Sequence, residues 1–445
     1  SSGHLREENI LSISGYKVKF PVGKKPFPAQ FSVMAQVLRA LHQSKNALIE
    51  SPTGTGKTLA LLCSTLSWQQ HHILTPPVPA KTENCGRSST KKMPKFKKIY
   101  FTSRTHSQIA QVVNALKRCP QFLVIGGVNT PVHSLKTTTL GSRQHYCVNP
   151  RVAKSTGGDL NEKCKSLVEK HQCEYRNSVK KLISATPPVW DIEDLVTTGA
   201  EVHGCPYYAS RDMVDAAHIV FAPYNYLLDP VIRKAMDIDL NGTVVVIDEA
   251  HNVEDVSREA ASCDLSQEDL LFSVEQLQRM IDLNTAEVQH YRQLLTIVQG
   301  VLDFVNERGD SLTLKDIEDG KKNTHSGISA AAVLKRRCGI HEENLTSLRG
   351  CVEAVVTASN EQDPDSETIS GQALTLINKL VTTCEYMLSH DLKNVESFRL
   401  VISASKVWQR QARGRGRNVV VRKFCLWCMN PAVAFEEVAR LSHSV

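Results

Sequence analysis

The sequence has no apolar run close to the ~20 residues that cross a bilayer, so we expect no membrane partner. Its first ten residues, SSGHLREENI, lack both the apolar core of a signal peptide and an initiator Met, and we interpret them as a trimmed end. A strong charge excess is also absent. A net charge of +7 over 445 residues permits a polyanionic partner without requiring one. This length predicts about two to four domains.

The thirteen cysteines are not accompanied by a secretory segment, so reduced thiols or metal ligation are favoured over a disulfide framework. Cys425 and Cys428 have the spacing of a metal or redox dithiol, but no second ligand pair lies nearby, and we interpret them as structural. Five further cysteines lie in apolar helical patterns and are expected in the core: Cys63, Cys119, Cys338, Cys351 and Cys384.

The strongest positive feature is the segment SPTGTGKT at residues 51–58. It follows a predicted strand, NALIE, and precedes a predicted helix, LALLCSTLSWQQ, which is the context of a phosphate-binding loop. Glycines let backbone N–H groups curl around phosphates, and the helix N-terminus adds partial positive charge. Ser51 stands where the strict motif has glycine. The predicted nucleotide-binding residues are Ser51, Pro52, Thr53, Gly54, Thr55, Gly56, Lys57 and Thr58.

The segment VVVIDEAHN at residues 244–252 predicts a buried strand that ends on two carboxylates. Asp248, together with Thr58, is expected to hold Mg²⁺, and Glu249 to orient and deprotonate the attacking water. His251 is placed to sense the γ-phosphate, and Lys57 to reach the β- and γ-phosphates. Alone, the acidic pair could be a strand running into a helix N-terminus. Paired with the loop, it predicts nucleoside triphosphate hydrolysis.

A third strand, at residues 97–103, ends in polar and basic residues before a helix. Ligands of an open parallel sheet gather at this edge, so the residues could bind ATP or the backbone of a nucleic acid. A solvated loop is the equal alternative. The candidates are Ser103, Arg104, Thr105 and His106.

Taken together, DEAH, SPTGTGKT and TSRTH resemble the XPD-like iron–sulfur DNA helicases of superfamily 2. The segments ALLCSTLSWQQ, PYNYLLDPVIR, VVVIDEAHNVED and CLWCMNPAVAF are most similar to the Fanconi anaemia group J branch, and the telomere elongation regulator branch is similar in several of the same places. The resemblance implies an α/β fold: a P-loop (RecA-like) parallel-sheet motor domain with an iron–sulfur insertion and a mainly helical arch insertion.

The resemblance also implies a four-iron, four-sulfur cluster between the two nucleotide motifs. Its ligands would be Cys147, Cys164, Cys173 and Cys205, with gaps of sixteen, eight and thirty-one residues. Four thiolates also suit Zn²⁺, so spacing alone leaves the metal open. Nearby basic residues could contact DNA phosphates: Arg143, Arg151, Lys154, Lys163, Lys165 and Arg176. In related helicases, a Gln in the position of Gln30 reads adenine, although a helix entrance at Pro28 is the local alternative.

The expected domains are residues 1–140 (motor domain, first part), 141–210 (iron–sulfur domain), 211–256 (motor domain, second part), 257–408 (helical arch) and 409–445 (return segment, opening with a basic link). No second motor domain follows, so we expect the first half of a nuclear, genome-maintenance helicase, binding single-stranded and forked DNA and DNA-repair proteins, and moving 5′ to 3′. The chain alone should hydrolyse ATP slowly. The alternatives are an RNA helicase and a non-catalytic iron–sulfur or zinc module.

Overall fold

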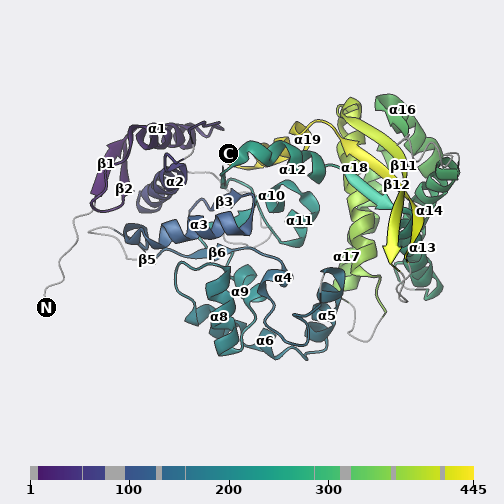
Figure 1. The fold of residues 1–445 in the computed structure, drawn as a ribbon, viewed down its shortest axis with the longest axis horizontal. Helices are drawn as coiled ribbons and strands as arrows, with labels where there is room; N and C mark the ends of the chain where they lie inside the picture. Colours follow the sequence, from purple (N-terminus) through teal and green to yellow (C-terminus); the bar gives the residue numbers. More distant parts are fainter. Residues whose placement is uncertain are drawn as a thin grey trace, which may run out of the picture. The chain divides into compact units, whose positions relative to one another are not determined.

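The computed structural model divides the chain into two units of dense internal contacts (Figure 1). It describes residues 9–52, 54–75, 96–126, 133–155, 157–284, 286–310, 322–361, 367–410 and 416–445. The first unit comprises Ser1–Tyr226, Ile238–His251 and Glu437–Val445, and the second comprises Leu227–Asp237 and Asn252–Glu436. No helix in the described part of the chain is long and apolar enough to cross a membrane.

The first unit is built on a parallel four-stranded sheet with the order β6-β7-β3-β8. Its strands are β6 (Thr137–Thr139), β7 (Ile219–Pro223), β3 (Ile99–Ser103) and β8 (Val244–Ile247). The near-continuous apolar sequences of β7, β3 and β8 suit strands that are buried on both faces, and β6 consists of three buried threonines. This confirms the expected α/β fold with a parallel sheet.

Helices and two short hairpins complete the motor part of this unit. Helix α3 contacts β3, β7 and α2, and α1 packs on α2 around the fully buried Leu38 and Leu66. The elements are β1 (Asn9–Ile13), β2 (Tyr16–Phe20), α1 (Pro28–Gln43), α2 (Lys57–Leu74), α3 (His106–Lys117), η1 (Pro120–Phe122), β4 (Val124–Ile125), β5 (His133–Ser134) and α10 (Asn225–Leu228). The predicted helices after the phosphate-binding segment and after β3 are therefore confirmed.

The strand expected at NALIE was wrong, because no strand is assigned there and Leu48 is 95% exposed. The C-terminal residues explain how this segment is held. Ser444 bridges β8 in parallel through Val244, and the Ala47 N–H donates to the Val445 carbonyl at 2.9 Å. The segment leading to the phosphate-binding loop thus joins the sheet through the far end of the sequence.

An insertion of short helices separates β6 from β7. Its elements are α4 (Arg143–Tyr146), α5 (Gly157–Glu169), α6 (Glu174–Asn177), α7 (Val179–Ala185), α8 (Ile192–Val202) and α9 (Pro206–Asp212). The second half has its own core around Leu182, Trp190 and Leu195. The first half buries only a small cluster around Val152 and Leu160. The first half of the insertion is therefore poor in buried apolar side chains.

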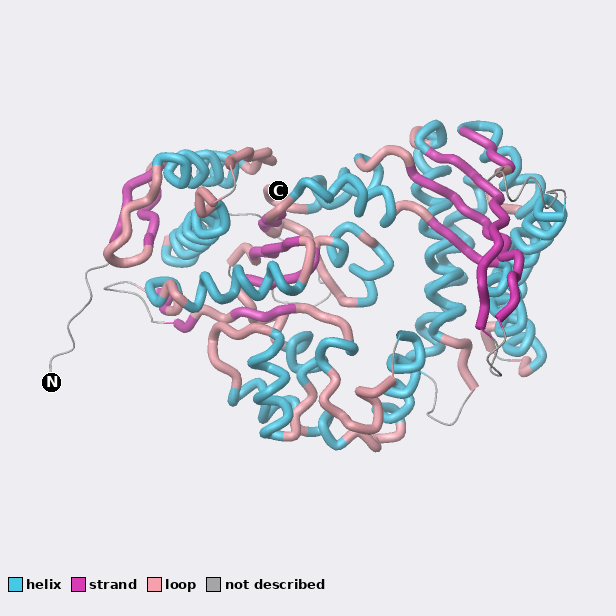
Figure 2. The backbone as a smooth tube through the Cα atoms, in the orientation of Figure 1, coloured by secondary structure: helices cyan, strands magenta, loops and turns pink. Residues whose placement is uncertain are grey.

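The second unit combines long helices with an antiparallel sheet, drawn in magenta among cyan helices in Figure 2. The sheet has the order β10-β11-β12-β9, with β9 (Cys263–Ser266), β10 (Asn323–Ser326), β11 (Phe398–Arg410) and β12 (Gly416–Cys428). Its helices are α11 (Pro230–Ala235), α12 (Val253–Ala260), α13 (Gln267–Asp282), α14 (Val288–Asp310), α16 (Gly327–Val333), η3 (Leu334–Cys338), α17 (Glu342–Glu361), α18 (Gly371–Leu392) and η4 (Val395–Ser397). The chain passes between the units within η2 (Ala250–Asn252) and again within α19 (Ala432–Leu441).

This sheet changes the expected path of the return segment. We expected residues 409–445 to rejoin the motor domain, but β12 pairs with β11 and β9 inside the second unit. Only Glu437–Val445 belong to the first unit. The basic link was expected at residues 410–418, and of these residues 411–415 lie outside the described part. The other domain limits remain predictions.

Candidate nucleotide site and cysteine pocket

The loop before α2 has the backbone geometry that its glycines predict. Gly54 and Gly56 have φ values of 78° and 74°, a region that glycine enters without steric cost. The Lys57 ammonium donates to the Ser51 carbonyl at 2.9 Å, and the Ser51 and Thr55 hydroxyls lie 2.8 Å apart. Thr53 lies outside the described residues. The lysine thus closes the loop over the position expected for the phosphates.

The two nucleotide motifs meet in one hydrogen bond. The Thr58 hydroxyl donates to Asp248 Oδ2 at 2.8 Å, across 190 residues of sequence. Asp248 is 7% exposed and follows β8 directly. Burial raises the pKa of this carboxyl, and the Thr58 hydrogen bond partly offsets the rise. A divalent cation here would favour the charged carboxylate, which has a hydroxyl ligand already beside it.

Glu249 has a backbone conformation that is rare for its residue type. Its φ is 56°, in the left-handed region, and its N–H donates to Asp248 Oδ1 at 3.1 Å. Strain of this kind persists where the surroundings impose it, and it is concentrated at functional sites. Glu249 Oε2 lies 3.4 Å from His251 Nδ1. The structure therefore brings Lys57, Thr58, Asp248, Glu249 and His251 to one edge of the sheet.

The Gln30 side chain contacts the backbone of the phosphate-binding loop. Its side chain donates to the Gly56 carbonyl at 3.2 Å and accepts from the Phe27 N–H at 2.9 Å. A Cβ on Gly56 would lie 2.3 Å from Gln30 Nε2, so glycine is required for this contact as well as for the φ angle. Gln30 is 5% exposed and directed at the loop backbone. Adenine reading by this residue stays a prediction.

The four residues expected to bind DNA after β3 differ in accessibility. Arg104 and Thr105 are exposed. Ser103 is buried and donates to Gln108 Oε1 at 3.1 Å, whereas Thr105 caps α3 by accepting from the Gln108 N–H. His106 packs edge-on to His145, and burial beside that ring lowers its pKa to about 4. Ser103 and His106 therefore serve the local fold here, and Arg104 presents a charge to solvent.

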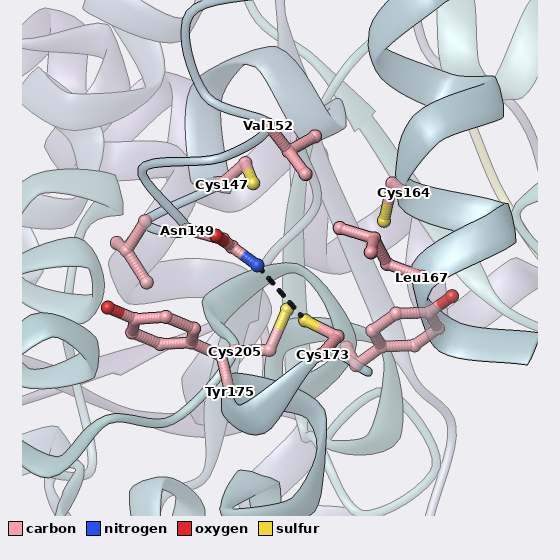
Figure 3. Close-up of a pocket in the computed structure, with 10 residues that line it drawn as sticks. Cys147, Asn149, Val152, Cys164, Leu167, Cys173, Tyr175 and Cys205 are labelled. Atoms are coloured by element: carbon pink, nitrogen blue, oxygen red, sulfur yellow. Dashed lines mark hydrogen bonds between the residues drawn. The ribbon is translucent and has the colours of Figure 1, made fainter. Parts of the chain in front are cut away.

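The four candidate metal ligands line one pocket in the insertion (Figure 3). Cys147 ends α4, Cys164 lies on α5, and Cys173 and Cys205 directly precede α6 and α9. Their sulfur atoms face the same space, which Val152 and Leu167 also border (Figure 3). The Asn149 amide donates to the Cys173 sulfur at 3.6 Å. Residues separated by up to 58 positions thus converge on one site.

The donor set of this pocket suits a metal centre held by several separated thiolates. Burial raises the pKa of Cys147, and it raises that of Cys205 to about 11, because a thiolate without a counter-charge is unfavourable there. A bound cation would reverse this preference. In the described part of the chain, no three His, Cys, Asp or Glu side chains stand close enough to hold a single ion. A cluster that binds each thiolate at a different iron requires less convergence.

Two of the basic residues expected to contact DNA lie over tyrosine rings. The Arg143 guanidinium lies 4.3 Å from the Tyr207 ring centroid, and Arg176 lies 4.3 Å from that of Tyr208. Tyr208 also borders the cysteine pocket. These tyrosines and Asn149 were not predicted from the sequence. Their closeness in sequence to the candidate ligands could have indicated them, since the tyrosines follow Cys205 by two and three residues and Asn149 follows Cys147 by two.

Comparisons with known proteins match the part of the chain that holds these features. Residues 101–270, which hold the cysteine pocket and the acidic strand end, match the family model described as DEAD_2. The chain thus carries a DEAD_2 family segment. This DEAD_2 segment begins within β3 and ends within α13.

Curated relatives extend the likeness beyond the DEAD_2 segment. Regulator of telomere elongation helicase 1 of Mus musculus is 37% identical over 328 residues, covering 68% of this chain and 26% of that protein. The Homo sapiens protein is 37% identical over 302 residues, covering 63% and 24%. The Drosophila melanogaster homolog is 28% identical over 483 residues, covering 96% and 47%. This chain thus spans about a quarter of its mammalian relatives.

A solved structure titled XPD_Helicase aligns over 94% of this chain and 57% of that one, with a TM-score of 0.46 and 17% identity. The relatives named here carry the telomere elongation name, which is the second of the two branches that the sequence resembles. The names of these relatives thus agree with the telomere elongation branch, and the Fanconi anaemia group J branch remains a proposal.

Proposed function

We propose that this chain is the nucleotide-binding motor part of an XPD-like, ATP-dependent DNA helicase that carries an iron–sulfur cluster. The observation that carries this proposal is the 2.8 Å hydrogen bond between Thr58 and Asp248. These two side chains are the expected Mg²⁺ ligands of the two motifs, and their contact supports a single nucleotide site at the carboxyl edge of the sheet.

The remaining residues then take complementary roles. Lys57, released from the Ser51 carbonyl, would bind the β- and γ-phosphates, and the N–H groups of Gly54 to Thr58 would surround them. Glu249 would accept the proton of the attacking water, with His251 beside its carboxylate. The metal ion, held by Thr58 and Asp248, would neutralise charge that develops on the phosphate oxygens.

Cys147, Cys164, Cys173 and Cys205 would hold a four-iron, four-sulfur cluster. The resemblance implies the cluster, and the four cysteines that line one pocket suit it; the alternative is a single tetrahedral ion, which needs all four sulfurs about 2.3 Å from one point. The group would cross-link the apolar-poor first half of the insertion to its second half. Anaerobically purified protein should contain iron and acid-labile sulfide. One zinc per chain without sulfide would reject the cluster.

DNA contact, 5′-to-3′ movement, a nuclear location and work with DNA-repair proteins are proposed from the resemblance. Arg104 and Thr105 support part of this proposal, since both are exposed at the carboxyl edge of the sheet. The Fanconi anaemia group J branch rests on the four sequence segments, and the telomere elongation branch is the alternative that the relatives support.

The nucleotide proposal is tested by measuring the affinity for a fluorescent ATP analogue with Mg²⁺. Lys57→Ala should weaken binding at least tenfold, about 1.4 kcal/mol, because a charge-assisted phosphate contact is lost. Lys45→Ala, an exposed lysine of the same unit, is the matched control and should bind normally. Glu249→Gln should bind normally and lose turnover. Equal binding loss in Lys57→Ala and Glu249→Gln would contradict the assigned roles.

A further inference from the structure

The two longest strands of the second unit form a hairpin that extends past the rest of their sheet (Figure 1). The pairing of β11 with β12 continues from Phe398↔Cys428 to Arg410↔Gly416. In contrast, β10 pairs with β11 only as far as Ile402, and β9 pairs with β12 only as far as Lys423. Beyond these points no other described strand accompanies the hairpin. We call residues 403–408 and 418–422 the hairpin arm.

One face of the hairpin changes from apolar and buried to exposed along its length. Successive residues of a strand point to opposite faces, so Leu400, Ile402, Ala404, Lys406 and Trp408 share one face. The first three are buried, whereas Lys406 and Trp408 are exposed. Trp408 is 62% exposed, which is unusual for the largest apolar side chain. Its ring is therefore available to a partner.

The charge of the hairpin has one sign. The strands Phe398–Arg410 and Gly416–Cys428 contain six Lys or Arg residues and no Asp or Glu. The Trp408 face carries Lys406 two residues away, at about 6.6 Å along the strand. Arg422 lies opposite Ala404 on the same face, but its side chain lies against Gly309 of α14. The exposed end of this face thus carries the Trp408 ring and the Lys406 cation.

We propose that the Trp408 face of the hairpin arm binds single-stranded DNA, with a base stacked on Trp408 and a phosphate near Lys406. Aromatic platforms flanked by positive charge are the common means of holding unpaired strands without sequence preference. The cores of protein interfaces are also rich in tryptophan but poor in charge, and a hairpin whose two strands carry six cations and no acid matches a polyanion better. This site is separate from the nucleotide site of the first unit.

The tryptophans of this chain provide a direct signal for the test. Of the four, Trp68 and Trp190 are at most 2% exposed, and Trp427 donates to Asp264 at 2.8 Å. Trp427 is half-buried, so fluorescence quenching by an oligo-dT strand, titrated without nucleotide, reports on Trp408 and Trp427, and the difference from Trp408→Phe gives the part due to Trp408. Quenching should be strong in the parent chain and largely lost in Trp408→Phe. Unchanged quenching in Trp408→Phe would overturn the proposal.

Affinity, measured by anisotropy of labelled oligo-dT, supplies the second readout. Trp408→Ala should weaken binding roughly five- to hundredfold, the range that loss of one base stack gives. Trp408→Phe should stay within a few-fold of the parent because it keeps a ring. Ile328→Ala, at another exposed apolar residue of the same unit, should bind like the parent. Equal affinity of Trp408→Ala and Ile328→Ala would overturn the proposal and favour a protein partner.

The positive charges are tested through salt dependence. Lys406→Gln should lower the slope of log affinity against log salt by about 0.7, the value for one phosphate contact on a single strand. Lys335→Gln, an exposed lysine outside the hairpin, should leave the slope unchanged. An unchanged slope in Lys406→Gln would overturn the assigned phosphate contact. Because no assay here uses nucleotide, failure of this proposal and failure of the proposed ATP site are distinguishable.

Discussion

The nucleotide edge and the cysteine pocket are both assembled from residues far apart in sequence, but the two sites are closed in different ways. At the nucleotide edge, protein groups already bond one another: Thr58 contacts Asp248, and Lys57 contacts the Ser51 carbonyl. In the pocket, four thiols face one space, and the Asn149 amide donates a hydrogen bond to the Cys173 sulfur.

This difference predicts different dependence on a bound group. The nucleotide edge is stabilised by the sheet beneath it and by its own hydrogen bonds, so it should keep its shape without ligand. The first half of the insertion has only the small cluster around Val152, Leu160 and Cys164 to hold it. A metal group would supply the missing cross-links there. Substitutions at the two sites should therefore differ in what they damage.

The largest expected effect is that of Cys173→Ser. Loss of the metal should release the first half of the insertion, because structural metals contribute on the order of 10 kcal/mol to small domains. Limited proteolysis with mass spectrometry should then show new cleavage within residues 148–172, while residues 175–212 stay protected by the core around Trp190. Cys351→Ser, at a buried cysteine of the second unit, is the control and should keep the metal. A parental cleavage pattern in Cys173→Ser would contradict the comparison.

Thr58→Val should have its main effect on ligand binding. It removes the hydroxyl that contacts Asp248 and the proposed Mg²⁺ ligand, so affinity for ATP should fall roughly tenfold or more with Mg²⁺ present. The free energy of unfolding should fall by about 1–3 kcal/mol, because a buried carboxylate loses its partner. Thr58→Ser keeps the hydroxyl and is the matched control. If both variants bind Mg-ATP alike, the contact in the structure is not the metal site.

Features that depend on local sequence patterns were predicted correctly, whereas features that depend on partners distant in sequence were not. The strand before Asp248 and the turn after β3 depend on local patterns, and both were predicted. NALIE was predicted wrongly because its partner is Val445, at the other end of the sequence. The antiparallel sheet of the second unit was missed although β11 and β12 have thirteen residues each. Its edge strands, β9 and β10, have four residues each, too few for a clear alternation.

The same limit applied at the site. Residue types and spacing predicted which side chains belong to the nucleotide edge, and the four cysteines came from a family resemblance. Neither source indicated that Ser103 would be buried under Gln108, or that Arg143 would lie over Tyr207. The first contact lies within the turn that caps α3, and the second depends on how α4 and α9 pack together inside the insertion. The buried thiols expected outside the pocket, such as Cys63 and Cys384, were predicted correctly from apolar periodicity.

Gly56→Ala tests how far the nucleotide edge is preformed. The substitution places an L side chain at φ 74° and a Cβ 2.3 Å from Gln30 Nε2, so it should cost about 1–3 kcal/mol of stability. Gln30→Ala should relieve the contact but not the backbone strain. In a double-mutant cycle measured by urea unfolding, the two changes should therefore couple favourably. Simple additivity would mean that Gln30 moves aside freely and does not support the loop.

The smallest expected effect lies at the base of the insertion, where the two sites join through β6 and β7. His218 precedes β7, stacks on Phe96 at 4.4 Å and accepts a hydrogen bond from the Lys136 N–H at 3.0 Å. Burial lowers its pKa to about 4, below the ordinary value of 6.5. The folded state therefore keeps this ring neutral at pH values where the unfolded chain binds a proton.

The sign of the pH dependence follows from that difference. Stability should be complete above pH 6.5 and fall as the pH drops towards 4, by at most about 1.4 kcal/mol per pH unit for one proton. His218→Asn keeps an acceptor for the Lys136 N–H but cannot titrate, so its stability should decline less steeply over this range. Urea unfolding of both proteins at pH 7, 6 and 5 measures the two slopes. Equal slopes would show that the loss of stability at acid pH arises from groups other than His218.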